Sequence, residues 1–259
     1  MPTGAITPYI DVAQVVLYAF WIFFAGLVIY LQRESKREGY PLVTGHKGER
    51  LEGFPTLPAP KTFLLPNGKT RSVPWNEPIE VLNAKSSAPW DGAPIIPLGD
   101  PMQDGLGPAA FTLRDTDPEL MPEGEARIVP LRVATDHWVA SEDPDPRGAA
   151  IICCDRQSPG TVVDIWIDRA DQMAVWLEAS LAADPARRVL VPIMLARVTG
   201  GAPGQTVKVM IKSVTAAQFA AAPALAHPDQ ISPREEDRLM AYFASGHLYA
   251  TPQRAEPLL

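Results

Sequence analysis

The segment from Val12 to Gln32 contains 21 consecutive residues without a charged side chain, and it constrains everything the chain can become. About twelve of them are Val, Leu, Ile or Phe, each of which favours membrane insertion by about 0.3 to 0.6 kcal/mol. A helix needs about 20 such residues to cross the hydrocarbon layer. The sequence therefore predicts a transmembrane helix over residues 12–32.

The charges beside this segment predict its orientation. All 23 Lys and Arg residues follow it, whereas Asp11 is the only charged side chain before it. Cytoplasmic flanks carry the excess of basic residues, so we expect residues 1–11 outside the cytoplasm and the remainder inside it. A cleaved signal peptide is the alternative, but it would carry its basic residues before a shorter apolar core.

Four residues directly after the span are candidates for contact with the membrane surface or with another subunit. They are Arg33, Lys36, Arg37 and Tyr40. Basic side chains in this position suit the anionic lipid headgroups of the cytoplasmic leaflet.

The remaining composition excludes some functions. The net charge of −7 argues against nucleic acid as a partner, because phosphate binding needs a basic surface. Cys153 and Cys154 are the only cysteines, and adjacent cysteines in a reducing compartment predict no disulfide. They follow an apolar run and are interpreted as buried strand residues, with a reactive or metal site as the alternative.

A proline-rich segment follows the span, which we assign to residues 33–110. Twelve of the 28 prolines fall between Pro41 and Pro108, which excludes helix and central sheet there. The segment keeps six large apolar residues: Phe54, Phe63, Leu64, Leu65, Trp75 and Trp90. We expect an extended segment that docks these side chains on a surface; a flexible linker is the alternative.

The sequence pattern of residues 111–259 is typical of a mainly β domain with one helix. Short apolar runs predict strands at Arg127–Ala134, Ala149–Cys154, Gly160–Asp168, Gln172–Leu181, Arg188–Val198 and Gln205–Val214. Their spacing favours a small antiparallel barrel or sandwich. Ser232-Pro233-Arg234-Glu235 is a capping box that starts a C-terminal helix, and Gly246 is expected to end it.

Motifs of catalysis and of metal or cofactor binding are missing from the sequence, which predicts a non-catalytic chain that ligates no cofactor itself. Carboxylates instead gather around the best strand pair, at Asp164, Asp168, Asp171 and Glu178, with Glu123 and Glu125 earlier. One interpretation is a solvated acidic face. The other is a proton relay, because neighbouring carboxylates raise one another's pKa toward neutral pH.

Several stretches of the chain are similar to one known family. They are Phe20–Phe23, Tyr30–Gln32, Arg37–Leu42, Pro60–Pro66, Gly99–Pro108, Val162–Asp168, Asp171–Ala174, Glu235–Asp237 and Gly246–Ala250. In this order they resemble the H subunit of the photosynthetic reaction centre of purple bacteria.

The resemblance implies a single transmembrane helix, a periplasmic N-terminus and a cytoplasmic PRC-type β-barrel, all in the bacterial inner membrane. It implies L and M subunits as partners, which carry bacteriochlorophyll, bacteriopheophytin, carotenoid, quinones and non-haem iron, with a cytochrome subunit or light-harvesting ring as further neighbours. The H subunit itself ligates none of these groups. It shields the quinone sites and supplies part of the proton path to the secondary quinone.

The resemblance also suggests residue roles. Asp168 and Asp171 match the family's two acidic residues nearest the quinone path, and the second is commonly glutamate, so Asp171 is one methylene shorter. Glu123 and Glu125 stand where some members have His-Gly-His at the point of proton uptake. Carboxylates titrate about two units lower than histidine, and they weaken the expectation of metal binding there.

Two other functions remain open at this point. The chain could be a free-standing adaptor that displays a β-barrel to a soluble partner, which would purify without near-infrared pigment. It could also be a membrane-tethered enzyme with a site that no sequence motif reveals.

Overall fold

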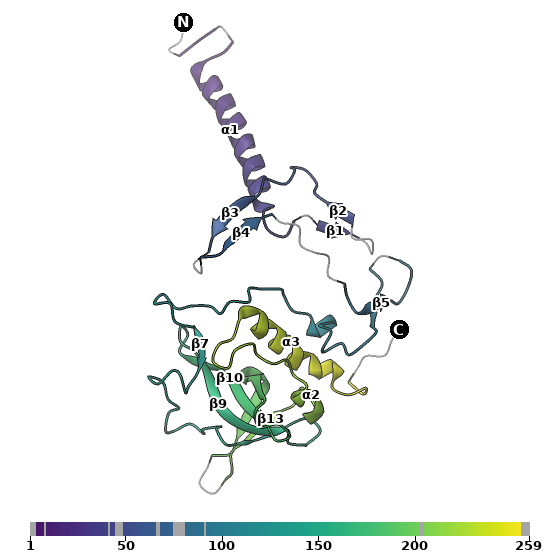
Figure 1. Ribbon diagram of the computed structural model, residues 1–259. Coiled ribbons are helices and arrows are strands. Elements are labelled where there is room, and N and C mark those ends of the chain that lie inside the picture. The colour runs from purple at the N-terminus through teal and green to yellow at the C-terminus, as the bar shows by residue number, and fades with distance from the viewer. Residues whose placement is uncertain are drawn as a thin grey trace. The chain divides into compact units, whose positions relative to one another are not determined.

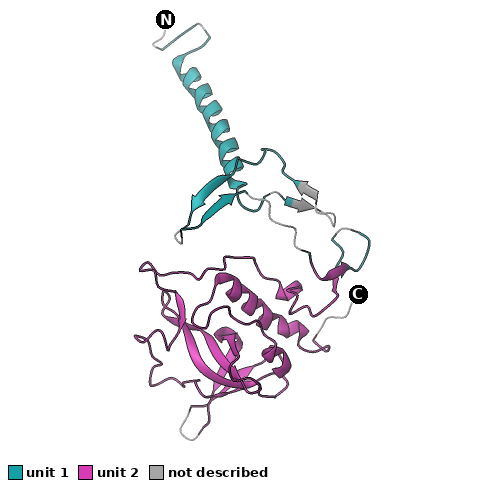
Figure 2. Cartoon of the chain, in the orientation of Figure 1, with its two compact units in different colours: residues 1–81, 86–94 teal, residues 82–85, 95–259 magenta. Residues whose placement is uncertain are grey.

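In the computed structural model, the chain forms two compact units (Figure 2). The structure describes residues 4–7, 9–40, 42–44, 49–65, 68–74, 81–90, 92–201 and 205–254. The first unit comprises residues 1–81 and 86–94, and the second comprises 82–85 and 95–259. Residues 95–110, which the sequence groups with the proline-rich segment, therefore belong to the second unit.

The first unit begins with helix α1, Val12–Ser35, which contains the predicted span and runs one turn beyond it. Asp11 caps its start: the carboxylate accepts from the Gln14 N–H at 2.7 Å, while the Gln14 side chain accepts from the Asp11 N–H. None of the helix residues is buried within the chain. An apolar helix of this length with no internal covering is consistent with a single-pass membrane protein.

The proline-rich part of the first unit forms small antiparallel hairpins. Strands β1 (Leu42–Thr44) and β2 (Glu49–Leu51) form one pair, and β3 (Lys61–Leu64) and β4 (Thr70–Val73) form another. A third pair consists of β5 (Ala84–Ser86) and β6 (Ile95–Pro97). Each of these pairs is a two-stranded sheet among the residues that the structure describes, as expected from the prolines.

Several of the large apolar side chains of this segment are exposed. Phe54 is 84% exposed, Trp90 63% and Phe63 48%, while Trp75 lies outside the described residues. Their predicted docking on a surface therefore stays a prediction about a partner.

The second unit is built on a seven-stranded curved sheet (Figure 1). Its order is β11 (Arg188–Pro192), β10 (Met173–Leu181), β9 (Gly160–Asp168), β8 (Ala150–Ile152), β13 (Lys208–Ile211) and β12 (Ala196–Thr199). Strand β7 (Ile128–Pro130) also pairs with β9. Together with α1 and the C-terminal helix, this confirms the predicted fold class.

The observed sheet corrects two details of that prediction. Strand β13 pairs with β8 in parallel, so the sheet is not purely antiparallel. The expected strand Arg188–Val198 is broken after Pro192 by a 3₁₀ turn, η2 (Ile193–Leu195), before β12 begins. A proline supplies no backbone donor, so the pairing of β11 ends at that point.

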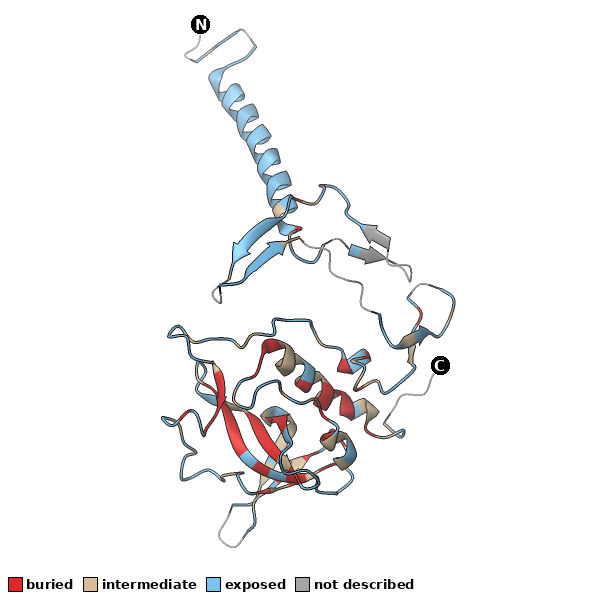
Figure 3. Ribbon diagram, viewed as in Figure 1, coloured by how far each residue is buried: buried red, intermediate tan, exposed pale blue. Residues whose placement is uncertain are grey.

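The buried residues of the second unit lie on the sheet and on two helices, and their side chains form one hydrophobic core (Figure 3). Helix α2 is Ala216–Ala220 and helix α3 is Pro233–Tyr249; the 3₁₀ turn η1 (Gly107–Ala109) packs on α3. The largest fully buried side chains include Trp166, Tyr242, Phe219 and Phe243. Phe219 and Phe243 meet edge to face with ring centroids 5.7 Å apart, a pairing worth about 0.5–1.5 kcal/mol beyond its area.

The capping box of α3 is confirmed, whereas its predicted end is wrong. Ser232 Oγ accepts from the Glu235 N–H at 3.3 Å, and Glu235 accepts from the Ser232 N–H at 2.8 Å. The helix continues through Gly246 to Tyr249. Gly246 serves close packing instead of termination, because a Cβ there would lie 2.4 Å from the Ser213 carbonyl oxygen.

Candidate functional site: a carboxylate cluster at the end of β9

Strand register determines which charged residues meet at the end of β9. Ile128 of β7 lies opposite Asp168, the last residue of β9, so Arg127 is delivered to the same end. The Arg169 N–H donates to the Arg127 carbonyl oxygen at 3.0 Å and extends this pairing by one residue. The turn after Asp168 then brings Asp171 back toward the strand end.

Arg127 is the centre of the resulting group. Its Nε donates to both oxygens of Asp168, at 3.0 and 2.9 Å, while its Nη2 forms an ion pair with Asp168 Oδ2 at 2.7 Å and donates to Asp171 at 3.1 Å. Its Nη1 donates to Glu119 at 3.0 Å. We call these four residues the Arg127 cluster. One guanidinium therefore holds three carboxylates, of which Asp168 receives the two-pronged contact.

The carboxylates of the Arg127 cluster differ in their exposure. The side chain of Asp168 is 6% exposed, whereas that of Asp171 is 60% exposed and that of Glu119 42%. Asp168 Oδ1 also accepts the N–H groups of Ala170 at 2.8 Å and of Asp171 at 3.2 Å. The cluster thus joins a buried, fully bonded carboxylate to two that reach solvent.

The pKa of Asp168 lies below its ordinary value. Burial acts to raise it, but the Arg127 hydrogen bonds and the two backbone N–H groups outweigh that effect. Asp168 is therefore ionised at neutral pH. The interpretation of a solvated acidic face is wrong for Asp168, and likewise for Asp164 and Glu178, because all three side chains are buried.

The predicted residues Glu123 and Glu125 lie at the tip of a hairpin that leads into β7. Leu120 and Ala126 form its bridge, and Gly124 takes a φ of +92° at the tip. Glu125 is 69% exposed and accepts from Arg169 Nη1 at 2.5 Å. Glu123 is exposed. The hairpin ends at the Arg127 cluster, because the Arg127 N–H donates to the Glu119 carbonyl oxygen at 2.8 Å.

One further carboxyl belongs to this region and was not selected from the sequence. Burial, followed by the negative charge of Glu119, raises the pKa of Glu236 to about 7. Asp168 acts in the same direction, while Arg114 and Arg127 oppose it. Glu236 lies in the first turn of α3, so this helix contributes a group that changes protonation near neutral pH.

A bridge of ion pairs connects α3 to the Arg127 cluster. Arg114 contacts Glu119 at 3.3 Å and Asp237 of α3 at 3.4 Å. The cluster therefore has charged neighbours on three elements: the hairpin of residues 119–127, the turn after β9 and the start of α3.

Asp164 and Glu178 lie apart from this group, around a second guanidinium. Arg132 Nη1 donates to Asp164 at 3.0 Å and to Glu178 at 2.6 Å, and Arg132 also pairs with Asp229. Glu178 additionally accepts from the buried Trp166 indole at 2.8 Å. These contacts tie β9 and β10 to the loop before α3, which is a structural role.

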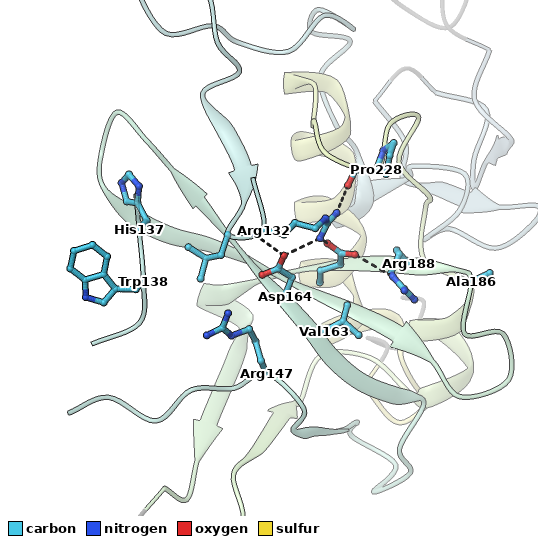
Figure 4. Close-up of a pocket in the computed structure, with 11 residues that line it drawn as sticks. Arg132, His137, Trp138, Arg147, Val163, Asp164, Ala186, Arg188 and Pro228 are labelled. Carbon is cyan, nitrogen blue, oxygen red and sulfur yellow. Dashed lines mark hydrogen bonds and ion pairs between the residues drawn. The ribbon is translucent and has the colours of Figure 1, made fainter. Parts of the chain in front are cut away.

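A cavity of about 680 Å³ opens beside this second group (Figure 4). Figure 4 shows Arg132 bonded to Asp164 and to the Pro228 carbonyl, with Arg147 and Trp138 farther along the wall. The carboxylates that line the cavity, Asp164 and Glu178, are committed to arginine partners.

The four juxtamembrane candidates differ in where they point. Lys36 is 4% exposed; its Nζ donates to the carbonyl oxygens of Glu52 at 2.7 Å and Pro55 at 2.6 Å and lies 5.1 Å from the centroid of the Tyr40 ring. Arg37 pairs with Glu34 at 2.8 Å and donates to the Ala59 carbonyl oxygen at 2.7 Å. Arg33 remains exposed.

In the part of the chain that the structure describes, no group of three or more His, Cys, Asp or Glu side chains could hold a metal ion.

Among known proteins, the chain is similar to one family over half of its length. Residues 4–133 match the family model described as photosynthetic reaction centre, H-chain N-terminal region. The matched region includes α1, the proline-rich segment and the hairpin that carries Glu123, Glu125 and Arg127.

Proposed function

Because the chain belongs to the photosynthetic reaction centre H-chain family, we propose that it delivers protons through the carboxylates at the end of β9 to a quinone held by its partner subunits. The family is generally non-catalytic, and membership implies assembly in a reaction-centre complex. In the proposal, this chain caps the L and M subunits on the cytoplasmic side and shields their quinone sites. The pigments, quinones and iron belong to those subunits.

The observation that carries the proposal is the composition of the Arg127 cluster. Asp171 and Glu119 are open to solvent, while the adjoining Asp168 is buried and bonded. A proton path needs groups that collect protons at the surface and a polar connection leading inward. Glu125 and Glu123 on the neighbouring hairpin would add to the collecting surface.

Glu236 supplies the property that Asp168 lacks. A pKa of about 7 means that this carboxyl is protonated in roughly half of the molecules at neutral pH. A group of this kind can accept and release a proton in one turnover. We therefore add Glu236 to the proposed path, next to the residues predicted from the sequence.

The proposed topology follows the distribution of charge around α1. The basic residues all follow the span, which supports an N-terminus outside the cytoplasm. Of the four juxtamembrane candidates, the exposed Arg33 is the one suited to anionic lipid headgroups. Lys36 and Arg37 hold the Glu52–Ala59 segment to the helix end, with Tyr40 beside Lys36, and Arg33 adds a long bond of 3.5 Å to the Leu57 carbonyl oxygen.

The test is the double substitution D168N/D171N in the assembled complex, followed by flash kinetics. Asparagine keeps the shape and removes the carboxyl groups. We expect normal pigment content and an unchanged first electron transfer to the secondary quinone. The second transfer, which is coupled to protonation, should slow, and the effect should grow as pH rises and protons become scarce.

The matched control is E142Q/D143N, which makes the same change of charge at two exposed residues outside the cluster. An unchanged proton-coupled rate in D168N/D171N between about pH 6 and pH 9 would refute the proposal. Purification of the chain without any near-infrared pigment would instead favour the free-standing adaptor.

A further inference from the structure

Arg127 makes unequal contacts with the three carboxylates around it. Asp168 accepts from Nε on both of its oxygens, forms an ion pair with Nη2 at 2.7 Å and accepts two backbone N–H groups. Asp171 receives one bond at 3.1 Å and is 60% exposed, and Glu119 receives one at 3.0 Å. The guanidinium thus makes more contacts with the buried carboxylate than with either exposed one.

We propose that Arg127 is a positioning residue that gives the two aspartates of the cluster different roles: it keeps Asp168 permanently ionised and leaves Asp171 as the carboxylate that exchanges protons with solvent. This inference rests on the proposed function and deepens it. Asp168 then orients Arg127 and the turn after β9 without itself carrying a proton.

The bonding capacity of Asp168 supports this division. Asp168 accepts only from N–H donors: Oδ1 accepts from Arg127 Nε and from the backbone of Ala170 and Asp171, and Oδ2 accepts from the same Nε and lies 2.7 Å from Nη2. Protonating it would break at least one contact to Arg127 and leave a buried cation with one counter-charge fewer. Asp171 loses only a single exposed contact when it takes up a proton, so it exchanges at lower cost.

Other charges around Arg127 must be counted in any pH profile. The hairpin contributes Glu119 and Glu125, the turn after β9 contributes Arg169 and Asp171, and α3 contributes Glu236 and Asp237, with Arg114 between them. Removing Arg127 leaves Asp168 beside Asp171, Glu119 and Glu236 without its main cation. Two carboxylates that share a site without a cation cannot both stay ionised as readily.

The experiment compares R127Q with R197Q in the assembled complex. Arg197 is an exposed residue of β12 outside the cluster, so R197Q controls for the loss of one positive charge. The proton-coupled rate falls as pH rises. In R127Q we expect this fall to occur at a pH that is higher by about one unit or more, since an adjacent opposite charge shifts the pKa of a carboxyl by about 1–3 units. R197Q should match the unmodified chain.

Two further variants identify the group responsible. R127Q/D168N should abolish the shift, because Asp168 is the carboxyl that Arg127 had kept ionised. R127K keeps the charge but not the two-pronged contact, and should give a smaller shift. The infrared band of a protonated carboxyl, followed in the resting complex during an acid titration, should appear at higher pH in R127Q and vanish in R127Q/D168N.

The outcomes separate this inference from the proposed function. Suppose that D168N/D171N slows the proton-coupled transfer but R127Q leaves both the pH profile and the infrared titration unchanged. The different roles of Asp168 and Asp171 are then refuted, while the proposed function in proton delivery is supported. A shift that persists in R127Q/D168N also refutes it. If R127Q does not assemble, R127K and the D168N and D171N single substitutions decide: equal slowing by both single substitutions contradicts the inference.

Discussion

The ammonium nitrogen of Lys36 lies 2.6 Å from the carbonyl oxygen of Pro55, although Lys36 directly follows a helix suited to a membrane. A second carbonyl, that of Glu52, lies 2.7 Å away, and the Tyr40 ring covers a third side. A buried ammonium with these partners stabilises a fold, and its loss leaves carbonyl oxygens without donors.

The substitution K36M should loosen the segment around Glu52 and Pro55. Methionine fills a similar volume but donates no hydrogen bond, so the two carbonyls lose their partner at a cost of about 1–3 kcal/mol. The backbone amides of residues 52–54, 56 and 57 should exchange hydrogen faster in K36M than in the control K212M, which alters an exposed lysine. Identical exchange in the two variants would show that the Lys36 contacts contribute nothing.

The elevated pKa of Glu236 makes stability depend on pH. The folded chain binds a proton at this group between about pH 4.5 and pH 7 that the unfolded chain does not bind. The free energy of unfolding should therefore fall as pH rises through this window, by about 2 kcal/mol from this group after allowance for its partial solvent contact.

Replacing the group with glutamine removes this dependence. E236Q should be more stable than the unmodified chain at pH 8 and about equal to it near pH 4.5. Urea unfolding of the detergent-solubilised chain at both pH values measures the difference, with E142Q as an exposed control. A curve for E236Q that falls with pH as steeply as the original would contradict the assignment.

Gly246 should not tolerate a side chain. The Cβ of alanine would lie 2.4 Å from the Ser213 carbonyl oxygen and 2.7 Å from Val214 Cγ1. Overpacking of this kind typically costs about 1–3 kcal/mol, so G246A should lower the melting temperature despite the better helix propensity of alanine. The neighbouring exposed substitution H247A is the control, and a G246A chain at least as stable as H247A would exclude the clash.

Cys153 should behave as an inert core residue. Burial is the main cause that raises the pKa of its thiol to about 12, so almost no thiolate exists at pH 8. In a C154S variant, maleimide should not label the folded chain and should label it fully in denaturant. Rapid labelling of the folded C154S chain would show that Cys153 is reachable and reactive.

The local parts of the fold could be predicted from sequence because their signals are local. Strand β9 has the predicted bounds Gly160–Asp168, and α3 begins at the predicted capping box of Ser232 and Glu235. The parallel pairing of β8 with β13 could not be predicted, since it joins residues about 58 positions apart and depends on the topology of the whole sheet. The predicted end of α3 at Gly246 was wrong for a similar reason. The glycine is needed for its close approach to Ser213, which is distant in sequence, and not to end the helix.

The candidate site divides in the same way. Asp168 and Asp171 were predicted, and the structure brings them together through Arg127. Arg127 itself was missed because its role follows from the register of β7 against β9, which the sequence does not specify. Glu236 carries no distinguishing sequence pattern, and its raised pKa follows from burial and the nearby charge of Glu119, which depend on the tertiary fold. A charged residue at the start of a short apolar strand was the one signal available for Arg127.

Helix α1 has a fixed length between two polar ends, which bears on how the chain responds to its bilayer. Its 24 residues extend about 36 Å, and the uncharged part about 32 Å, close to a hydrocarbon thickness of about 30 Å. Capping by Asp11 at one end and the bonds of Lys36 at the other oppose any sliding through the membrane. Tilt of the helix is one way to relieve hydrophobic mismatch in a thinner bilayer. Because Lys36 binds the carbonyl oxygens of Glu52 and Pro55, such a tilt would move the backbone at these two residues together with the helix.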